Sequence, residues 1–241
     1  MAGLFDKQAE IYLDARPTYP GEWYSKLAVL TPHHIVSELK PDQYDMVLEL
    51  RELIPSQPIP FGPVAEHYEK VVGTDVSEDQ LKLGRPHPRI RYLYTPESIT
   101  DDELVAMIGG ENSVDLVTVA QAVHWFDLPK FYSNVTRLLR KPGGVIAVWG
   151  YNQIVTLPFP FESVGLGSEG KPILLDIPKK LSFEGFLKLV RSWSAVTTAK
   201  DQAVDLLSDG VVKEFEHAWG GPGLVRSVVY KVFMIAGKVK L

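Results

Sequence analysis

Cysteine is absent from all 241 residues of the chain. Without thiols the protein can have no disulfide framework, no thiolate nucleophile and no metal site built on cysteine. The six histidines also lack the paired spacing that is typical of metal ligands, so we expect no metal site. These absences exclude the disulfide-rich secreted class, and a cytoplasmic location fits best.

Long apolar segments are also missing. The longest apolar run, Val114 to Val123, contains Asp115 and Gln121. It is far shorter than the ~20 residues that a membrane helix needs. The first residues, MAGLFDKQAEIY, carry charges where a secretory signal requires an apolar segment. We therefore expect no membrane association.

A strong charge of either sign is lacking as well. The formal net charge is −5 at pH 7, and the lysines and arginines are scattered along the chain. Proteins that bind nucleic acid gather cations against the phosphates, so we expect no nucleic-acid partner. A small molecule is the expected partner. The hydrophobic content of 45% and the absence of a linker predict one domain over residues 1–241.

Apolar segments alternate with helical patterns through the chain. Strands are expected at 44–50, 70–75, 89–95, 115–120, 145–149 and 227–235. Helices are expected at 3–14, 21–30, 64–69, 77–83, 100–109, 127–140, 182–193 and 208–219. Thr100 and Glu103 form a capping box, and Asp127 and Ser182 are N-cap candidates. Alternation of this kind predicts an α/β fold with a mostly parallel sheet.

An acidic residue ends the second expected strand, Lys70 to Asp75. An acid at the carboxyl end of a parallel strand can accept hydrogen bonds from both hydroxyls of a ribose. Asp75 is therefore a candidate ligand for a nucleoside cofactor. A turn or cap residue is an equally good interpretation of the local pattern, so the rest of the sequence must decide between them.

Three further segments resemble one known family. The stretch SVDLVTVAQAVHWFD, residues 113–127, is similar to the fourth-strand motif of class I S-adenosylmethionine-dependent methyltransferases. The stretch LLRKPGGVIAVW, residues 138–149, is similar to their Pro-Gly-Gly and fifth-strand motif. The segment FDKQAEIY with RPTYP, within residues 5–20, resembles the N-terminal cap of the plant and fungal branch. That branch includes the trans-aconitate-type methyltransferases, which carry a type 11 methyltransferase domain.

The resemblance implies a Rossmann-like α/β fold with seven strands, helices on both faces and an antiparallel C-terminal strand. It divides the single domain into an N-terminal cap (1–31), a cofactor-binding half (32–151) and a substrate-side half (152–241). The implied cofactor is S-adenosyl-L-methionine. The implied substrate is a small-molecule oxygen acceptor, either a carboxylate or a hydroxyl.

Site residues follow from the same resemblance, residue by residue. The implied cofactor-binding set is Asp75 on the ribose with Val76 beside it, Glu97 and Ser98 near the adenine, Ala120 and Gln121 beneath the methionine part, and Glu49 as the acid of the first strand. His124 is the implied catalytic residue, which would take a proton from a hydroxyl acceptor. A packing role is the alternative for this histidine.

Three other residues are implied on the substrate or lid side, namely Tyr12, Arg16 and Trp125. The guanidinium of Arg16 could bind a carboxylate of the cofactor or of an acidic substrate, because its geometry allows two parallel hydrogen bonds. Alternatively, Arg16 holds the N-terminal cap in place. Packing is the alternative role of Trp125.

The glycine-rich loop of the family is missing. Family members carry Asp-x-Gly-x-Gly-x-Gly after the first strand, where glycines let the backbone approach the cofactor. Between Thr31 and Ala65 this chain has a single glycine, Gly62, and Arg51 stands where the first family glycine belongs. We therefore expect weakened cofactor binding.

Two alternative functions remain open. The first is a non-catalytic binding or structural protein of the same fold, which would not bind the cofactor. The second is a nicotinamide-dependent oxidoreductase, because Asp75 would suit the ribose of that cofactor equally well. The glycine pattern at 165–170 lies far from the first strand–helix unit and does not open a helix, which argues against the second alternative.

Overall fold

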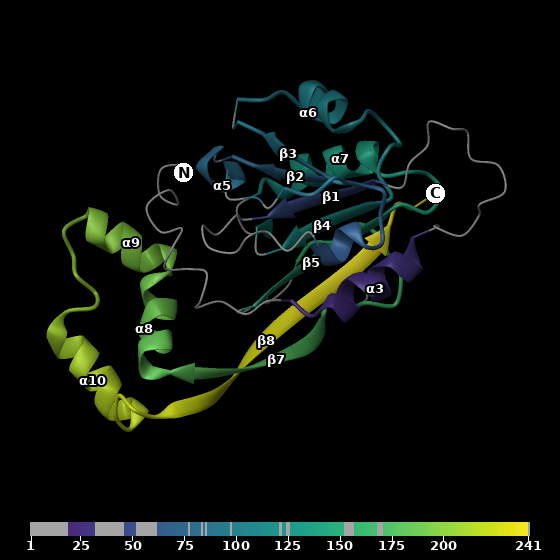
Figure 1. The fold of residues 1–241 in the computed structure, drawn as a ribbon. Helices are drawn as coiled ribbons and strands as arrows, with labels where there is room; N and C mark the ends of the chain where they lie inside the picture. Colours follow the sequence, from purple (N-terminus) through teal and green to yellow (C-terminus); the bar gives the residue numbers. More distant parts are fainter. Residues whose placement is uncertain are drawn as a thin grey trace.

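One mixed β-sheet organises the fold (Figure 1). The computed structural model of the protein describes residues 19–31, 46–51, 62–76, 78–82, 84, 86–96, 98–120, 122–123, 126–151, 157–167 and 171–240. Its strands are β1 (Met46–Arg51), β2 (Lys70–Asp75), β3 (Ile90–Tyr94), β4 (Leu116–Ala120), β5 (Val145–Tyr151), β6 (Glu162–Ser163), β7 (Ile173–Ser182) and β8 (Val225–Lys238). Its helices are α3 (Gly21–Leu30), α4 (Gly62–Ala65), α5 (Glu78–Lys82), α6 (Asp101–Ile108), α7 (Leu128–Leu138), α8 (Phe183–Arg191), α9 (Ser194–Asp201) and α10 (Asp209–Trp219).

Strands β1 to β5 are parallel, and the strand order is β3-β2-β1-β4-β5-β8-β6. Strand β8 is antiparallel to β5, which confirms the expected antiparallel C-terminal strand. The expected number of seven strands is wrong, because the described residues form a sheet of eight. Strands β6 and β7 pair with different stretches of the long β8, namely residues 237–238 and 225–234.

The sequence indicates an extended segment over residues 161–175, and β7 (Ile173–Ser182) continues beyond its end. Pro178 lies within it, opposite Val229 of β8. Proline has no N–H to donate to a second neighbour, so a strand with only one partner tolerates it. Pairing with β8 therefore stabilises this segment as a strand, although the proline within it argues locally against one.

Helices cover both faces of the sheet, as expected. On one face, α3 and α4 pack against residues such as Leu116 and Trp149. On the other face, α6 and α7 pack against residues such as Val117 and Val148. All five residues of β4 are buried, because this central strand is covered from both sides.

The predicted helix caps are confirmed. The Thr100 hydroxyl accepts from the Glu103 amide at 3.2 Å, and the Glu103 carboxylate accepts from the Thr100 amide at 2.9 Å. The Asp127 carboxylate accepts from the Lys130 amide at 3.3 Å. Ser182 caps α8, which ends at Arg191, so the expected helix to residue 193 is shorter and a separate helix α9 follows.

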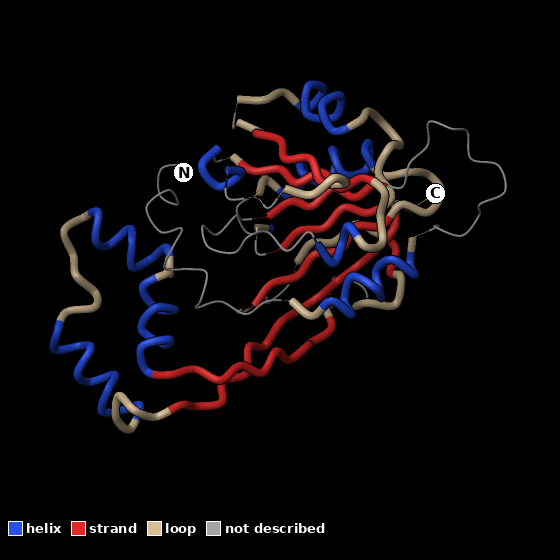
Figure 2. The backbone as a smooth tube through the Cα atoms, in the orientation of Figure 1, coloured by secondary structure: helices blue, strands red, loops and turns tan. Residues whose placement is uncertain are grey.

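Strands β7 and β8 continue beyond the sheet as a two-stranded ribbon that carries α8, α9 and α10 (Figures 1 and 2). Aromatic packing joins the helices, and the rings of Phe186 and Trp219 stack with centroids 5.0 Å apart. In Figure 1 this arm lies on the side to which the parallel strands point. None of the described helices is both long and apolar enough to cross a membrane.

Candidate cofactor and active site

The carboxyl ends of the parallel strands bring two predicted cofactor residues to one edge of the sheet. Asp75 is the last residue of β2, and Ala120 is the last residue of β4. Strand β1 lies between them, with Leu50 beside Thr74 and Arg51 beside Ala120. Because adjacent strands are about 4.8 Å apart, the backbones at Asp75 and Ala120 are separated by ~10 Å, a span that suits a nucleoside-sized ligand.

Asp75 is buried, with 6% of its surface exposed. Its carbonyl oxygen accepts a hydrogen bond from the Thr95 amide at 2.8 Å, which fixes the backbone where β2 and β3 end. A carboxylate removed from water must be hydrogen-bonded or paired, because its desolvation is costly. An ionised carboxylate is an acceptor only and can take several hydrogen bonds, so hydroxyl groups of a ligand at this edge could bind Asp75 in addition to the interactions it already makes.

Two more predicted residues lie near the same edge. Val76 follows Asp75 directly and is 38% exposed, so its side chain is available to a ligand. Ser98 is exposed and follows β3, in a turn where the Ile99 amide donates to the Pro96 carbonyl at 3.0 Å. The residues that were predicted to lie near the adenine of the cofactor therefore belong to the segment that follows β3.

The described residues at the end of β4 and just after it, Ala120, Ala122 and Val123, are apolar and buried. Ala120 and Ala122 are each 2% exposed, and Val123 is 5% exposed. This connection leads to Asp127, whose carboxylate caps α7. The small side chain of Ala120 adds little bulk between the backbone and a ligand, as the predicted contact with the methionine part requires.

Six predicted site residues lie outside the described residues, namely Tyr12, Arg16, Glu97, Gln121, His124 and Trp125. Their roles, including the catalytic role of His124, stay predictions. The backbone of Glu49 is described: it pairs with Gly73 and Thr118, two residues before the end of β1. Glu49 thus stands in the strand itself, and β1 continues through Arg51.

An aromatic cluster at the end of β5 was not predicted. Trp149 is fully buried and lies beside Ala120 in the sheet. Tyr19 and Tyr24 meet its ring edge-on, with centroids 5.7 and 5.9 Å away, and Trp23 lies 6.5 Å away. The sequence offered one signal for this cluster, the spacing of its aromatic residues. Trp23 and Tyr24, within the expected helix 21–30, follow Tyr19 by four and five positions. The cluster seals the α3 face next to Ala120 against water.

Tyr132 of α7 is a second buried aromatic residue, packed edge-on against Phe159 and Phe161 at 6.2 and 5.4 Å. Its hydroxyl has no hydrogen-bond partner among the described residues. Burial raises the pKa of Tyr132 to about 12, because the phenolate would lose its hydration. This phenol therefore stays protonated at neutral pH and cannot act as a base.

Several known proteins that this chain resembles in sequence or fold are named as methyltransferases. Residues 59–148 match the methyltransferase domain family (type 11). A candidate methyltransferase of Dictyostelium discoideum is 24% identical, over 97% of this chain and 94% of that protein. A probable S-adenosylmethionine-dependent methyltransferase of Saccharomyces cerevisiae is 31% identical, over 40% of this chain and 33% of that protein. The solved structure of a candidate type II methyltransferase from Anaeromyxobacter dehalogenans has a TM-score of 0.64 at 23% identity, covering 92% of this chain and 97% of that chain.

The domain match includes the strands that carry Asp75 and Ala120, and it begins after β1. The match therefore covers β2 and β4, which carry the candidate site, but not β1, after which family members have the glycine-rich loop. The structural likeness shows the fold, and the domain match and the relatives show a similarity to methyltransferases. The matches also argue against the nicotinamide-dependent alternative. The chain thus resembles S-adenosylmethionine-dependent methyltransferases in its domain match over residues 59–148 and in the relatives that it is similar to.

Proposed function

We propose that the protein transfers a methyl group from S-adenosyl-L-methionine to an oxygen of a small molecule, either a carboxylate or a hydroxyl. The observation that carries the proposal is the buried carboxylate of Asp75 at the same sheet edge as the small Ala120. The chemistry of these residues fits one part of the cofactor. The carboxylate of Asp75 can accept hydrogen bonds from both ribose hydroxyls, and the methyl side chain of Ala120 leaves room for a ligand beside β4.

The methionine end of the cofactor fits less well. Strand β1 keeps its strand pairing through Arg51, which is aligned with Ala120, and the sequence there has no glycine. Backbone amides that glycines would bring close to the cofactor are then harder to present. We accordingly propose that the ribose end contributes most of the affinity, and that binding is weaker than in proteins with the glycine-rich loop.

The cofactor supplies a methyl group made electrophilic by its sulfonium, and the protein must align the acceptor with it and exclude water. In our proposal Asp75 orients the ribose, and the cluster around Trp149 keeps water out beside Ala120. His124 takes the proton on a ring nitrogen when the acceptor is a hydroxyl. A carboxylate acceptor is already ionised at neutral pH and requires no base.

Residues 152–241 provide the substrate side in this proposal, since the arm of α8 to α10 lies beyond the carboxyl ends of the strands (Figure 1). The likeness of the N-terminal segment to trans-aconitate-type methyltransferases favours an acidic acceptor, with Tyr12, Arg16 and Trp125 on the lid side. A small carboxylic acid is therefore the first substrate class to test.

Calorimetric titration with S-adenosylmethionine tests the proposal directly. Asp75→Asn keeps the shape of the side chain and removes its charge, so we expect affinity to fall about 10- to 100-fold, as for a charged hydrogen bond lost. Asp176→Asn is the matched control, because Asp176 lies on the exposed ribbon paired with Lys231. Unchanged affinity in Asp75→Asn would exclude Asp75 from the site. No binding by the unmodified chain would favour the non-catalytic alternative.

A further inference from the structure

The ribbon formed by β7 and β8 has a covered inner face and an exposed outer face. Side chains alternate between the faces along a strand, and residues directly opposite each other in an antiparallel pair share a face. On the inner face, Leu181, Val228 and Tyr230 belong to one apolar cluster with Trp219 of α10. The outer face consists of eight exposed residues, namely Leu174, Asp176, Pro178 and Lys180 of β7 with Val225, Ser227, Val229 and Lys231 of β8. The helices of the arm therefore cover the inner side of the ribbon.

Apolar side chains lie at both ends and in the middle of the outer face. Leu174 at one end is 76% exposed, Val225 at the other end is 61% exposed, and Val229 between them is 47% exposed. Pro178 lies opposite Val229. A two-stranded ribbon is only marginally stable in water, and a further layer on its apolar face would stabilise it. Contiguous exposed apolar surface of this kind is typical of a contact site for another protein.

The charged residues of the outer face are arranged evenly about Pro178. Asp176 lies two residues before it and pairs with Lys231, with Nζ 2.8 Å from Oδ2. Lys180 lies two residues after it on the same face. If a second ribbon packs on this face in the antiparallel direction, with a two-fold axis at Pro178 and Val229, each Asp176 faces Lys180 of the other copy. Opposite charges then meet twice, so the face is complementary to itself.

The rest of the fold selects the antiparallel direction. Phe233 lies opposite Leu174 at the sheet end of the outer face, and it packs in one cluster with Val105 of α6 and Val135 of α7. The outer face is therefore on the side of the sheet that these two helices cover. Packed sheets are about 10 Å apart and a helix is about 10 Å across, so in a parallel arrangement the helices of the two copies would collide. The antiparallel arrangement places the second copy beyond the far end of the ribbon, away from α6 and α7 (Figure 2).

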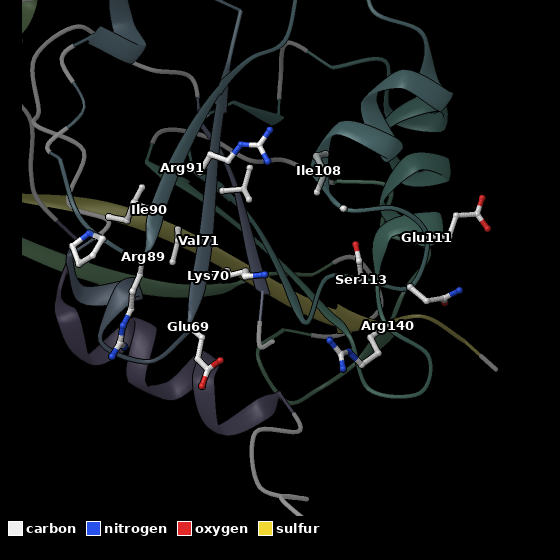
Figure 3. A pocket seen from close by; sticks show the side chains of 14 residues that line it. Glu69, Lys70, Val71, Arg89, Ile90, Arg91, Ile108, Glu111, Ser113 and Arg140 are labelled. Carbon is white, nitrogen blue, oxygen red and sulfur yellow. The ribbon is translucent and has the colours of Figure 1, made fainter. Parts of the chain in front are cut away.

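The pocket in Figure 3 is a separate surface. Its volume is about 730 Å³, and it opens beside the amino ends of β2 and β3. Arg140 in its lining is paired with Asp115. The arm lies on the side to which the parallel strands point, at the opposite end of these strands (Figure 1). Contacts made by the ribbon are thus independent of the pocket.

We propose that the outer face of the ribbon is the interface of a homodimer, in which a second copy packs its own outer face antiparallel on the first. Val229 of each copy lies beside Val229 of the other near the two-fold axis. Each Asp176 lies between Lys231 of its own chain and Lys180 of the other. Ten residue pairs on two strands give a face about 33 Å long and 10 Å wide, smaller than a permanent interface, so the dimer is reversible. The dimer does not depend on methyl transfer.

Sedimentation velocity of the full chain tests self-association. We expect the average mass to rise from one chain towards two between about 1 and 200 μM, as for a dissociation constant in the micromolar range. Val229→Thr keeps the branched shape but places a hydroxyl in the contact, so it should weaken the dimer about tenfold. Val29→Thr is the matched control and should have no effect, because Val29 is 79% exposed on α3, outside the ribbon. A chain that stays monomeric at every concentration would overturn the proposal.

Charge reversal tests the antiparallel register. Lys180→Glu and Asp176→Lys should each weaken the dimer about tenfold or more, because like charges then face each other twice. An equimolar mixture of the two variants should form a mixed dimer with most of the original affinity, since both contacts are again between opposite charges. Lys26→Glu, at an exposed position of α3, is the control and should have no effect. Failure of the two variants to associate with each other would contradict the register.

A single introduced thiol locates the two-fold axis, because the chain has no cysteine of its own. Diamide should oxidise Val229→Cys to a disulfide-linked dimer, since residues beside a two-fold axis lie next to their own copies. Val29→Cys should form such a dimer about tenfold more slowly, although Val29 is the more exposed valine.

The same variants distinguish other occupants of the face. Faster crosslinking of Val29→Cys than of Val229→Cys would overturn the proposal. A monomeric Val229→Cys variant that resists a thiol reagent would show that the same chain covers the face. A monomeric variant that reacts readily would leave the face to a different partner. Either result would exclude the homodimer.

Discussion

Arg140→Ala should destabilise the protein strongly, because it removes the guanidinium that faces a buried carboxylate. Asp115 lies just before β4 with its side chain 4% exposed, and Arg140 is 20% exposed. The two groups form a fork, with Nε–Oδ1 at 2.9 Å and Nη2–Oδ2 at 3.2 Å. The backbone is fastened at the same point, since the Arg140 amide donates to the Val114 carbonyl at 2.8 Å.

The magnitude follows from the burial. Removing one partner of a buried ion pair typically costs 3–5 kcal/mol, since the remaining charge stays desolvated. The partial exposure of Arg140 lets water reach the site, so we expect a loss of about 2–4 kcal/mol in the free energy of unfolding. Asp115→Asn should cost less, about 1–2 kcal/mol, because Arg140 can turn towards solvent. The double variant should cost less than the sum of the two.

Urea denaturation followed by tryptophan fluorescence provides the measurement, with equal m-values required for a valid comparison. Arg140→Lys is the informative control. It retains the charge but not the two-pronged geometry, so an intermediate loss would separate charge from geometry. A loss below about 1 kcal/mol in Arg140→Ala, or strict additivity in the double variant, would refute the reasoning.

Two further predictions concern the cofactor and a helix cap. Replacing residues 34–64 with a first strand and glycine loop of the family type should tighten S-adenosylmethionine binding on the order of 30- to 100-fold, because it adds two or three hydrogen bonds of ~1 kcal/mol each. Asp75→Ala in each chain is the control for binding at the expected site. If both chains bind equally well and both lose binding with Asp75→Ala, the unmodified chain holds the cofactor in another way. Thr100→Ala should destabilise the protein by about 1 kcal/mol at neutral pH, because it removes an N-cap. The hydrogen bonds from Thr100 lower the pKa of Glu103, so their contribution is present above its ordinary pKa and is lost as the pH falls through the folded-state pKa. The difference between the urea midpoints of the two proteins should therefore be smaller at acid than at neutral pH, because the bond from the Thr100 hydroxyl to the Glu103 carboxylate is lost while the bond from the Glu103 amide to the Thr100 hydroxyl remains. A difference that does not change with pH would contradict this linkage.

Local signals in the sequence were sufficient for several elements. Strand β2 has the bounds that were expected, Lys70 to Asp75, since two adjacent valines lie in a short segment that ends at an acid. The caps at Thr100, Asp127 and Ser182 were also predicted correctly. Each of these features depends on contacts within about four residues, and such contacts are visible in the sequence without knowledge of the fold.

The candidate site was predictable only in part. The resemblance placed Asp75 and Ala120 near one ligand, and the register puts them at one edge with β1 between them. The aromatic cluster around Trp149 was missed, because its partners in α3 are more than a hundred residues away in the chain. Composition does not indicate which distant aromatic residues will meet.

The sequence by itself determined the alternation of strands and helices, the helix starts and the acid at the end of β2. The tertiary structure decided the rest. Pro178 is accepted in β7 because, among the residues that the structure describes, that strand pairs with β8 alone. Strands β6 and β7 can both pair with β8 because β8 is long enough to reach each of them. The alignment of Arg91 with Val72 likewise depends on the register of β2 and β3. Strand register is set by long-range packing on both faces of a sheet, and no local pattern specifies it.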